Sequence, residues 1–320
     1  MKGQGSQHRS PVGIHFASSY ERHDTGPGHP ESAERYRVLE AALSELPEDF
    51  IRLPGRAAAV SEVLLAHDSN YHDLVRRDVA EFSDCLQTGD TAICHQSYDV
   101  ALDATGAVLA AVDAVMCGDV SSAFCAVRPP GHHATAARGM GFCIFNHVAI
   151  AARYLQSRHG LKKIAIIDWD VHHGNGTEAI FLRDPSVLYI SLHEKNIYPF
   201  TGSESERGQG AGAGCNLNIP LPAKSDGHLA LREWVDKLEP AIDAFQPDFL
   251  LISAGFDARM DDPIGGLRWD DRTFAEMTRR CGEMAWKWSR GRIVSSLEGG
   301  YNPPGLAAAA LAHVRALAES

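Results

Sequence analysis

The apolar positions of the chain recur with two different spacings, and these predict two kinds of element. Segments with apolar residues three and four positions apart predict helices, and short runs rich in β-branched residues predict buried strands. We expect helices at residues 32–46, 69–79, 98–116, 145–157, 229–244, 273–288 and 306–318. We expect strands at residues 12–17, 123–127, 164–167, 187–192, 249–253 and 293–296. From residue 123 onward, strands and helices therefore alternate.

This alternation predicts an α/β fold with a single open, mostly parallel, doubly wound sheet. The chain has 320 residues, and that length alone does not decide between one large domain and two smaller ones. The glycine-rich segment 202–214 is too short for a domain linker, and the polar segment 82–96 is typical of a surface loop. We therefore expect a flexible tail over residues 1–10 and one domain over residues 11–320.

Polar side chains gather just past the ends of several predicted strands. His132 and His133 follow one strand, residues 168–173 follow the next, and Asp257 and Tyr301 follow two later ones. Ligand sites of open α/β sheets lie at the carboxyl edge of the strands. We therefore expect these side chains to meet there, although they are spread over most of the chain.

The segment from Asp168 to Gly176 carries the strongest sign of a metal site. In an extended chain alternate side chains share a face, so Asp168, Asp170 and His172 project to one side. Asp170, His172 and Asp257 are the proposed ligands of a zinc ion, with a fourth position open as in catalytic sites. The alternative is a solvated turn whose side chains satisfy backbone groups. Two carboxylate ligands neutralise the zinc charge, so such a site needs a general base beside the metal.

The pair His132 and His133 supplies candidates for that base. We expect His133 to activate water and later to protonate the leaving amine, with Asn175 orienting its ring. His132 is its expected partner, held by Asp168. Taken alone, a pair of histidines in a loop is more often a packing element.

Tyr301 follows two glycines, which permit a close backbone approach. Its phenol is the expected donor to a tetrahedral oxyanion, although Gly-Gly-Tyr by itself could be a simple turn. The parts together predict metal-assisted hydrolysis of an amide without a covalent intermediate. The chain has no Gly-x-Ser-x-Gly nucleophile motif and no phosphate-binding loop.

The composition restricts the classes of partner that the protein is expected to bind. The chain is 44% hydrophobic and 22% charged, and its net charge of −11 argues against a general nucleic-acid binder. An acidic surface is compatible with a cationic substrate. Seven scattered cysteines without a CxxC pair or a secretory signal suggest reduced thiols in the cytoplasm. We expect no apolar run to approach membrane-spanning length, and therefore no membrane partner.

The motifs resemble those of the zinc-dependent histone deacetylase family, which includes bacterial amidohydrolases and acetylpolyamine deacetylases. The resemblance runs from about Gly13 to Tyr301. It rests on Arg128-Pro-Pro-Gly-His-His-Ala134, Gly141-Phe-Cys-Ile-Phe-Asn146, Asp168-Trp-Asp-Val-His-His-Gly-Asn-Gly176, Ser191-Leu-His193, Ala254-Gly-Phe-Asp257 and Glu298-Gly-Gly-Tyr301. Asn175, where some members carry Asp, points to the class II side of the family. Residues 11–320 then form a deacetylase-like catalytic domain with the arginase/deacetylase fold.

The resemblance implies the same zinc ligands, histidine pair and tyrosine, and it adds further sites. It implies a potassium ion at Asp168, Asp170, His172, Ser191 and Leu192, and a second one at Phe181, Asp184, Val187 and Cys215. It also implies a substrate tunnel with Gly141, Phe142 and Tyr198 in its wall and Asp90 at its rim. Tyr198 stands where Phe is more usual, so the tunnel gains a hydroxyl.

One departure from the family pattern bears on the substrate. Polyamine deacetylases of the family place a glutamate shortly after the third zinc ligand, whereas this chain has Ile264 there. We therefore expect an N-acyl-lysine or related acylamide substrate, with acetylpolyamine as the alternative because Asp261 and Asp262 could supply the charge. A binuclear manganese ureohydrolase and an inactive metal-binding sensor are the more distant alternatives. The sequence leaves the acyl length, the native metal (zinc or ferrous iron) and any homo-oligomer open.

Overall fold

A computed structural model describes residues 11–320, which form one sheet of eight parallel strands. The strand order is β2-β1-β3-β8-β7-β4-β5-β6, which confirms the predicted α/β fold. The strands are β1 (Val12–His15), β2 (Phe50–Arg52), β3 (Ser122–Cys125), β4 (Ile164–Asp168), β5 (Val187–Glu194), β6 (Asn216–Leu221), β7 (Phe249–Ala254) and β8 (Ile293–Leu297). The predicted tail at residues 1–10 lies outside the described residues.

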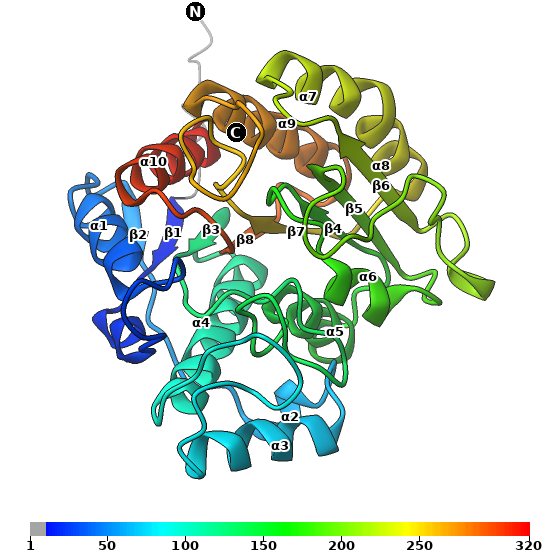
Figure 1. The fold of residues 1–320 in the computed structure, drawn as a ribbon. Coiled ribbons are helices and arrows are strands. Elements are labelled where there is room, and N and C mark those ends of the chain that lie inside the picture. Colours follow the sequence, from blue (N-terminus) through cyan, green and yellow to red (C-terminus); the bar gives the residue numbers. More distant parts are fainter. Residues whose placement is uncertain (1–10) are drawn as a thin grey trace, which may run out of the picture.

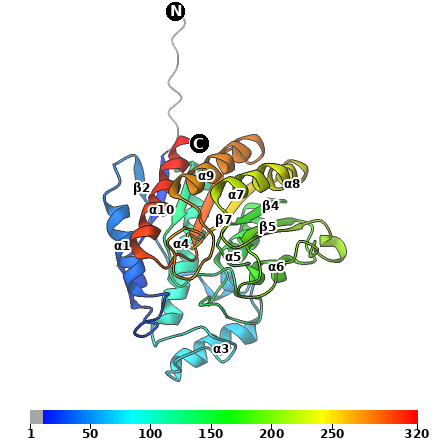
Figure 2. The ribbon, with the colours of Figure 1, turned by 45° about the horizontal axis from the view of Figure 1, so that its top comes forward.

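Helices cover both faces of the sheet (Figure 1). They are α1 (Ala33–Ser44), α2 (Val60–Val63), α3 (Ser69–Ala80), α4 (Ser97–Cys117), α5 (His147–His159), α6 (Asn175–Phe181), α7 (Gly227–Glu233), α8 (Glu239–Phe245), α9 (Asp271–Trp288) and α10 (Pro303–Glu319). Helices α1, α7, α8, α9 and α10 lie on one face, and α4 and α5 lie on the other (Figure 1). Helices α9 and α10 pack side by side in both views (Figures 1 and 2).

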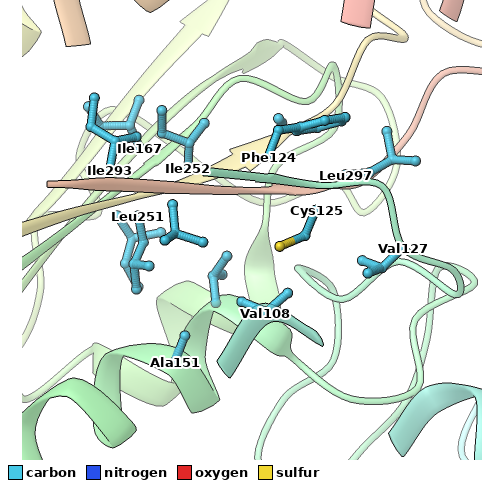
Figure 3. Packing of buried hydrophobic residues seen from close by; sticks show 14 of the residues in the cluster. Val108, Phe124, Cys125, Val127, Ala151, Ile167, Leu251, Ile252, Ile293 and Leu297 are labelled. Atoms are coloured by element: carbon cyan, nitrogen blue, oxygen red, sulfur yellow. The ribbon is translucent and has the colours of Figure 1, made fainter. Parts of the chain in front are cut away.

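The core consists of apolar side chains that leave both faces of the central strands. Phe124 and Cys125 are neighbours on β3 and point to opposite sides of the sheet, as period-two geometry requires (Figure 3). Below the sheet in this view, Cys125 faces Val108 of α4, and Ala151 of α5 lies nearby (Figure 3). Burial on both faces explains why these strands are continuous apolar runs.

Four of the named helices and strands do not appear among the predicted ones: the four-residue helix α2, strands β2 and β6, and helix α6. Strand β6 lacks a continuous apolar run, since polar and apolar residues alternate along it. Its asparagines, Asn216 and Asn218, donate hydrogen bonds to Glu178 of α6. Its Pro220 is tolerated because β6 is an edge strand. Strand β2 is a short edge strand with exposed residues, so it lacks an apolar pattern. Helix α6 begins at Asn175, inside the Asp168–Gly176 motif, for which we predicted an extended chain.

The helix predicted over residues 229–244 is divided in the structure. A π-helical segment, Trp234–Leu238, joins α7 to α8. The amide of Glu239 bonds to the carbonyl of Trp234, five residues back. Pro240 at the start of α8 has no amide hydrogen, so the regular helical ladder is interrupted at this point.

The expectation that no apolar segment approaches membrane-spanning length was wrong for α4. Within residues 11–320, this 21-residue helix with a mean hydropathy of 1.8 is long and apolar enough to cross a membrane. However, 61% of its most apolar window is buried, and it packs against β3, β8 and α5. The core helix of a globular domain has the same composition, so one such helix is weak evidence for a membrane span.

Candidate active site

The carboxyl edge of the sheet brings the predicted residues together. In register, Asp168 at the end of β4 lies beside Ser191 of β5 and Ser253 of β7, and Ser253 lies beside Ser296 of β8. The loops that leave β3, β4, β7 and β8 at this edge carry the histidine pair, the aspartates, His172 and Tyr301. The predicted convergence of these segments is therefore present.

Asp170, His172 and Asp257 form a buried cluster whose ligand atoms all lie within 4.8 Å of one another. His172 Nδ1 is 3.0 Å from Asp170 Oδ1 and 3.2 Å from Asp257 Oδ2. Backbone amides hold the other carboxylate oxygens: Gly299 donates to Asp170 Oδ2 at 2.8 Å and Val171 donates to Asp257 Oδ1 at 2.8 Å. The three side chains are thus aimed at a common point.

The electrostatics of this cluster fit a bound cation. Burial and the Asp170 carboxylate raise the pKa of Asp257 to about 7. Burial opposes the charged form of His172, yet its bonds to Asp170 and Asp257 raise its pKa to about 10. Asp257 Oδ2 is buried and receives no hydrogen bond of good geometry. Such an oxygen requires a positive partner, and two carboxylates with one imidazole nitrogen are a donor set that suits zinc.

Two glycines give the cluster its space. A Cβ on Gly255 would lie 2.2 Å from Asp170 Oδ2, and a Cβ on Gly299 would lie 2.1 Å from Asp257 Oδ2. No other residue type leaves room for both carboxylates at these distances. The loops after β7 and β8 therefore form a cradle around the proposed metal position.

The histidine pair has the two contacts expected from the sequence. His132 Nδ1 lies 3.0 Å from Asp168 Oδ2, and His133 Nδ1 lies 2.7 Å from Asn175 Oδ1. Burial disfavours the imidazolium of both rings. For His132, the carboxylates of Asp168 and Asp170 overcome this and raise the pKa well above its usual range. For His133, burial and the neighbouring His132 lower the pKa, so the two rings have opposite preferences for the proton.

Glu298 is a site residue to which our sequence analysis assigned no role. Its Oε2 accepts from the amides of Gly131 at 2.6 Å and His132 at 3.1 Å, and its Oε1 accepts from Ser253 Oγ at 2.9 Å. It therefore fixes the backbone of the histidine loop to β7 and β8. Its place directly before Gly-Gly-Tyr was the only signal, and the residues that it bonds lie more than 40 positions away.

Tyr301 lies at the same edge, with its backbone amide bonded to Asp262 Oδ2 at 2.6 Å. The Arg35 guanidinium lies 5.2 Å from the centre of its ring. Burial and the carboxylates of Asp257 and Asp170 raise the pKa of the phenol well above its usual range. The hydroxyl therefore stays protonated at neutral pH and can donate a hydrogen bond.

The expected tunnel residues surround the histidines and the tyrosine. The ring of Phe142 meets that of Tyr301 edge to face at 6.0 Å, and the ring of Tyr198 meets that of His133 at 5.1 Å. Asp90 Oδ1 accepts from the amide of Gly141 at 2.7 Å, which places Asp90 beside this wall. The hydroxyl of Tyr198 is buried and has no hydrogen-bond partner in the described part of the chain. Ile264 is 39% exposed.

Gly141 is required at its position by contact and by conformation. Its φ is +56°, and a Cβ would lie 2.3 Å from His133 Cδ2. We expect Gly141→Ala to displace His133 and to lower kcat/KM about 10–100-fold, because catalysis is sensitive to small misplacements. Gly118→Ala is the matched control, since Gly118 has a φ of +82° and no atom within 4 Å of its Cβ position. Equal kinetics of the two variants would contradict the assigned contact.

A buried ion cluster ties the first loop to the site. Glu31 pairs with Arg128, at 2.5 Å from Nε to Oε1, and with Arg35, at 3.0 Å from Nη1 to Oε1. Arg35 in turn donates to the carbonyls of Glu298 at 2.6 Å and Gly300 at 2.8 Å. These residues are far apart in sequence, so local patterns could not reveal the cluster. It fixes the loop that carries Tyr301.

The charge of Glu31 should contribute to stability. Burial opposes that charge, but the attraction of Arg128 and Arg35 is the larger effect, and it lowers the pKa of Glu31 from 4.5 to about 2. A carboxyl whose pKa is lowered by folding stabilises the protein above its unfolded pKa, and we expect about 3 kcal/mol to be lost as pH falls from about 4.5 to 2. Glu31→Gln should cost about 3–5 kcal/mol at pH 7, since two buried arginines lose their partner. Denaturant unfolding measures both effects, and an unchanged free energy would refute them.

The residues expected to hold the first potassium ion lie together. Asp168 and Ser191 are register partners, with Leu192 next on β5 and Asp170 and His172 in the loop after β4. The Ser191 hydroxyl lies 2.9 Å from His193 Nδ1. The geometry brings these groups to one place, and the ion itself stays a prediction.

The residues of the second expected potassium site lie around the end of α6. The carbonyl of Phe181 accepts from the amide of Asp184 at 2.9 Å, and that of Cys215 accepts from Tyr189 at 3.0 Å. Val187 begins β5. The Asp184 carboxylate pairs with Arg153, whose guanidinium lies 4.7 Å from the Phe181 ring. The Asp184 carboxylate is thus already paired with a cationic side chain, and the second potassium ion stays a prediction.

Comparison with known proteins gives a consistent result. The sequence profile of the histone deacetylase domain matches residues 29–317. The chain is 38% identical over 300 residues to a probable deacetylase of Archaeoglobus fulgidus, covering 92% of this chain and 82% of the relative. It is 34% identical over 278 residues to a histone deacetylase-like amidohydrolase of Pseudomonas aeruginosa, covering 86% and 73%. The crystal structure of the HDA15 HD domain superposes with a TM-score of 0.90 at 33% identity, covering 97% of this chain and 90% of that one.

Proposed function

Because the chain belongs to the histone deacetylase family, whose members hydrolyse amides, we propose that it removes acetyl or another short acyl group from acyl-lysine or a related acylamide. Asp170, His172 and Asp257 would hold the zinc ion. One observation carries the proposal: Oδ2 of Asp257 is buried, receives no hydrogen bond of good geometry and lies in a cluster of metal-binding side chains. The cluster adjoins the histidine pair, since the rings of His133 and His172 lie 5.9 Å apart.

The chain's own groups divide the remaining chemistry. A bound zinc ion supplies Lewis acidity, which lowers the pKa of a water molecule and polarises a carbonyl group. The bond from His133 Nδ1 to Asn175 Oδ1 places the ring proton on Nδ1, so Nε2 is free to accept a proton from water. The same nitrogen then holds that proton for the leaving amine. His132 is held in place by its contact with Asp168, and it helps to keep the neighbouring ring of His133 in this orientation.

Tyr301 has the role of oxyanion donor. Its phenol stays protonated for the reasons given above, and its ring is fixed by Phe142 and Arg35. A donor held in place before the reaction stabilises developing negative charge without reorganisation. Asp262 and Arg35 also hold the loop that carries Tyr301.

The environment of Ile264 favours lysine-type substrates over acetylpolyamines. The two carboxylates that could replace the missing glutamate are already engaged. Asp261 pairs with Arg259, and Asp262 accepts from the amides of Tyr301 at 2.6 Å, Ile264 at 2.9 Å and Gly265 at 3.2 Å. Neither is therefore free to bind a distant ammonium group.

Release of free amine tests the proposal. Acetyl-lysine, trifluoroacetyl-lysine and acetylspermidine are compared, with and without a hydroxamate chelator. We expect chelator-sensitive turnover of the lysine substrates and little turnover of acetylspermidine. A preference for acetylspermidine would favour the polyamine alternative and overturn the argument from Ile264. Failure to turn over any of the three would contradict the proposed substrate class.

Two further assignments belong to the same proposal. A potassium ion at the Asp168 and Ser191 position would lie behind the zinc ligands and hold their backbone in place. Ferrous iron is the other metal that the ligand set could take. We also propose that the protein acts in the cytoplasm, in line with its seven cysteines, none of which forms a disulfide within residues 11–320.

A further inference from the structure

Two buried histidines outside the catalytic pair lie directly beneath the loop that carries Tyr198. They are His173, which follows the ligand His172, and His193 on β5, and their ring centroids are 4.9 Å apart. His173 Nδ1 lies 2.8 Å from Thr201 Oγ1, and His193 Nε2 lies 3.0 Å from the carbonyl oxygen of Gly202. The pair therefore contacts two consecutive residues that follow Tyr198 by three and four positions.

Gly202 rests on both rings at once. Its φ is +85°, and a Cβ would lie 2.5 Å from His193 Nε2 and 2.6 Å from His173 Cγ. A side chain at this position cannot fit unless the loop or the histidines move. The close approach of the Gly202 backbone to the two rings therefore fixes the position of the Tyr198–Gly202 loop relative to the sheet.

The rings themselves are fixed from behind. His173 Nε2 lies 3.1 Å from Glu178 Oε2, which also accepts from Asn216 Nδ2 at 2.8 Å and Asn218 Nδ2 at 2.7 Å. His193 Nδ1 lies 2.9 Å from Ser191 Oγ. Every ring nitrogen of the pair thus has a partner, and neither ring can turn without breaking a buried hydrogen bond.

Helix α6 connects this arrangement to the catalytic centre. Its first residue, Asn175, bonds to His133, and Glu178 lies one turn later and bonds to His173. Tyr198, on the loop above the two histidines, also contacts the catalytic centre, since its ring lies 5.1 Å from that of His133. The base and the tunnel wall opposite it are therefore held by the same short helix.

We propose that His173 and His193 are positioning residues for substrate binding. They form a seat on which the loop from Tyr198 to Gly202 rests, and the seat keeps Tyr198 in the tunnel wall beside His133. The inference rests on the proposed deacylation, because the wall has a kinetic meaning only for a substrate that enters it. Neither histidine touches the substrate, so the seat acts through the placement of Tyr198.

Gly202→Ala tests the seat, and Gly214→Ala is its matched control. Both glycines have a left-handed backbone, with φ of +85° and +90°, but Gly214 has no atom within 4 Å of its Cβ position. Backbone strain should lower the Tm of both variants, and the clash with the two rings should lower that of Gly202→Ala further. Only Gly202→Ala should raise KM for acetyl-lysine substrates about tenfold with kcat nearly unchanged, because it disturbs binding rather than the base. Equal KM values in the two variants would overturn the proposal.

A second pair of variants avoids the backbone. Thr201→Val removes the hydroxyl that bonds His173 and keeps the shape of the side chain, whereas Thr201→Ser keeps the hydroxyl. We expect a raised KM in the first and a near wild-type KM in the second. The same KM in both would show that the contact with His173 does not position the wall.

Hydrogen exchange separates failure of the seat from failure of the proposed function. Amides of residues 197–206 should exchange faster in Gly202→Ala than in Gly214→Ala, whether or not the protein turns over acetyl-lysine. If the wild-type protein lacks that activity, the proposed function fails and exchange alone decides the seat. Equal exchange rates of this segment in the two variants would refute it.

Discussion

Tyr301→Phe should lower kcat about 10²–10³-fold while metal content stays at the wild-type level, since one oxyanion donor contributes about 3–4 kcal/mol to the barrier. The hydroxyl is removed from a ring that keeps its contacts with Phe142 and Arg35, so the loop should stay in place. Steady-state kinetics and metal analysis measure the two effects. Because Tyr301 acts in the transition state, KM should change little.

Tyr98→Phe is the matched control for this loss. The hydroxyl of Tyr98, on α4, bonds to His72 of α3 at 2.8 Å and contacts none of the residues assigned to the site, so its removal should leave kcat unchanged. Undiminished turnover by Tyr301→Phe would refute the oxyanion role. Loss of metal together with activity would instead assign Tyr301 to the integrity of the metal site.

His172→Ala should lose metal and activity together. The substitution removes the imidazole nitrogen that lies between Asp170 and Asp257, and it leaves two buried carboxylates facing each other. Removal of one of three ligands weakens zinc binding severely, and we expect turnover to fall by at least about 10³-fold. Metal content after dialysis and amine release measure the two losses.

His228→Ala serves as the control for His172→Ala, because His228 is an exposed histidine at the start of α7. It should keep both metal and activity. Circular dichroism establishes that each variant is folded. A fully metallated and active His172→Ala protein would contradict the ligand assignment.

The sequence was sufficient to predict the alternating architecture and the edge at which the site lies. Its apolar runs are long because both faces of the central strands are buried, and each of these strands is followed by the chemistry at its carboxyl end. Asp170, His172 and Asp257 could be chosen in advance because residue type and spacing already restrict the metal chemistry. Their common burial, and the lack of a well-formed hydrogen bond to Oδ2 of Asp257, could be seen only in the structure.

The supporting residues could not be predicted for a physical reason. Glu298, Arg35 and Glu178 act on partners distant in the chain, and a buried charge reveals nothing in sequence about which backbone groups it will bond. Strand β6 escaped prediction for a related reason. Its polar positions are buried by Glu178, so the usual link between polarity and exposure does not hold there.

The proposed function requires a metal ion that Asp170, His172 and Asp257 would hold, and this is the central claim to test. We would dialyse the wild-type protein against a strong chelator and measure amine release from an acetyl-lysine peptide before and after zinc is returned. We expect no turnover by the metal-free protein and recovery at about one equivalent of zinc per chain. Undiminished turnover by protein shown to be free of metal would contradict it.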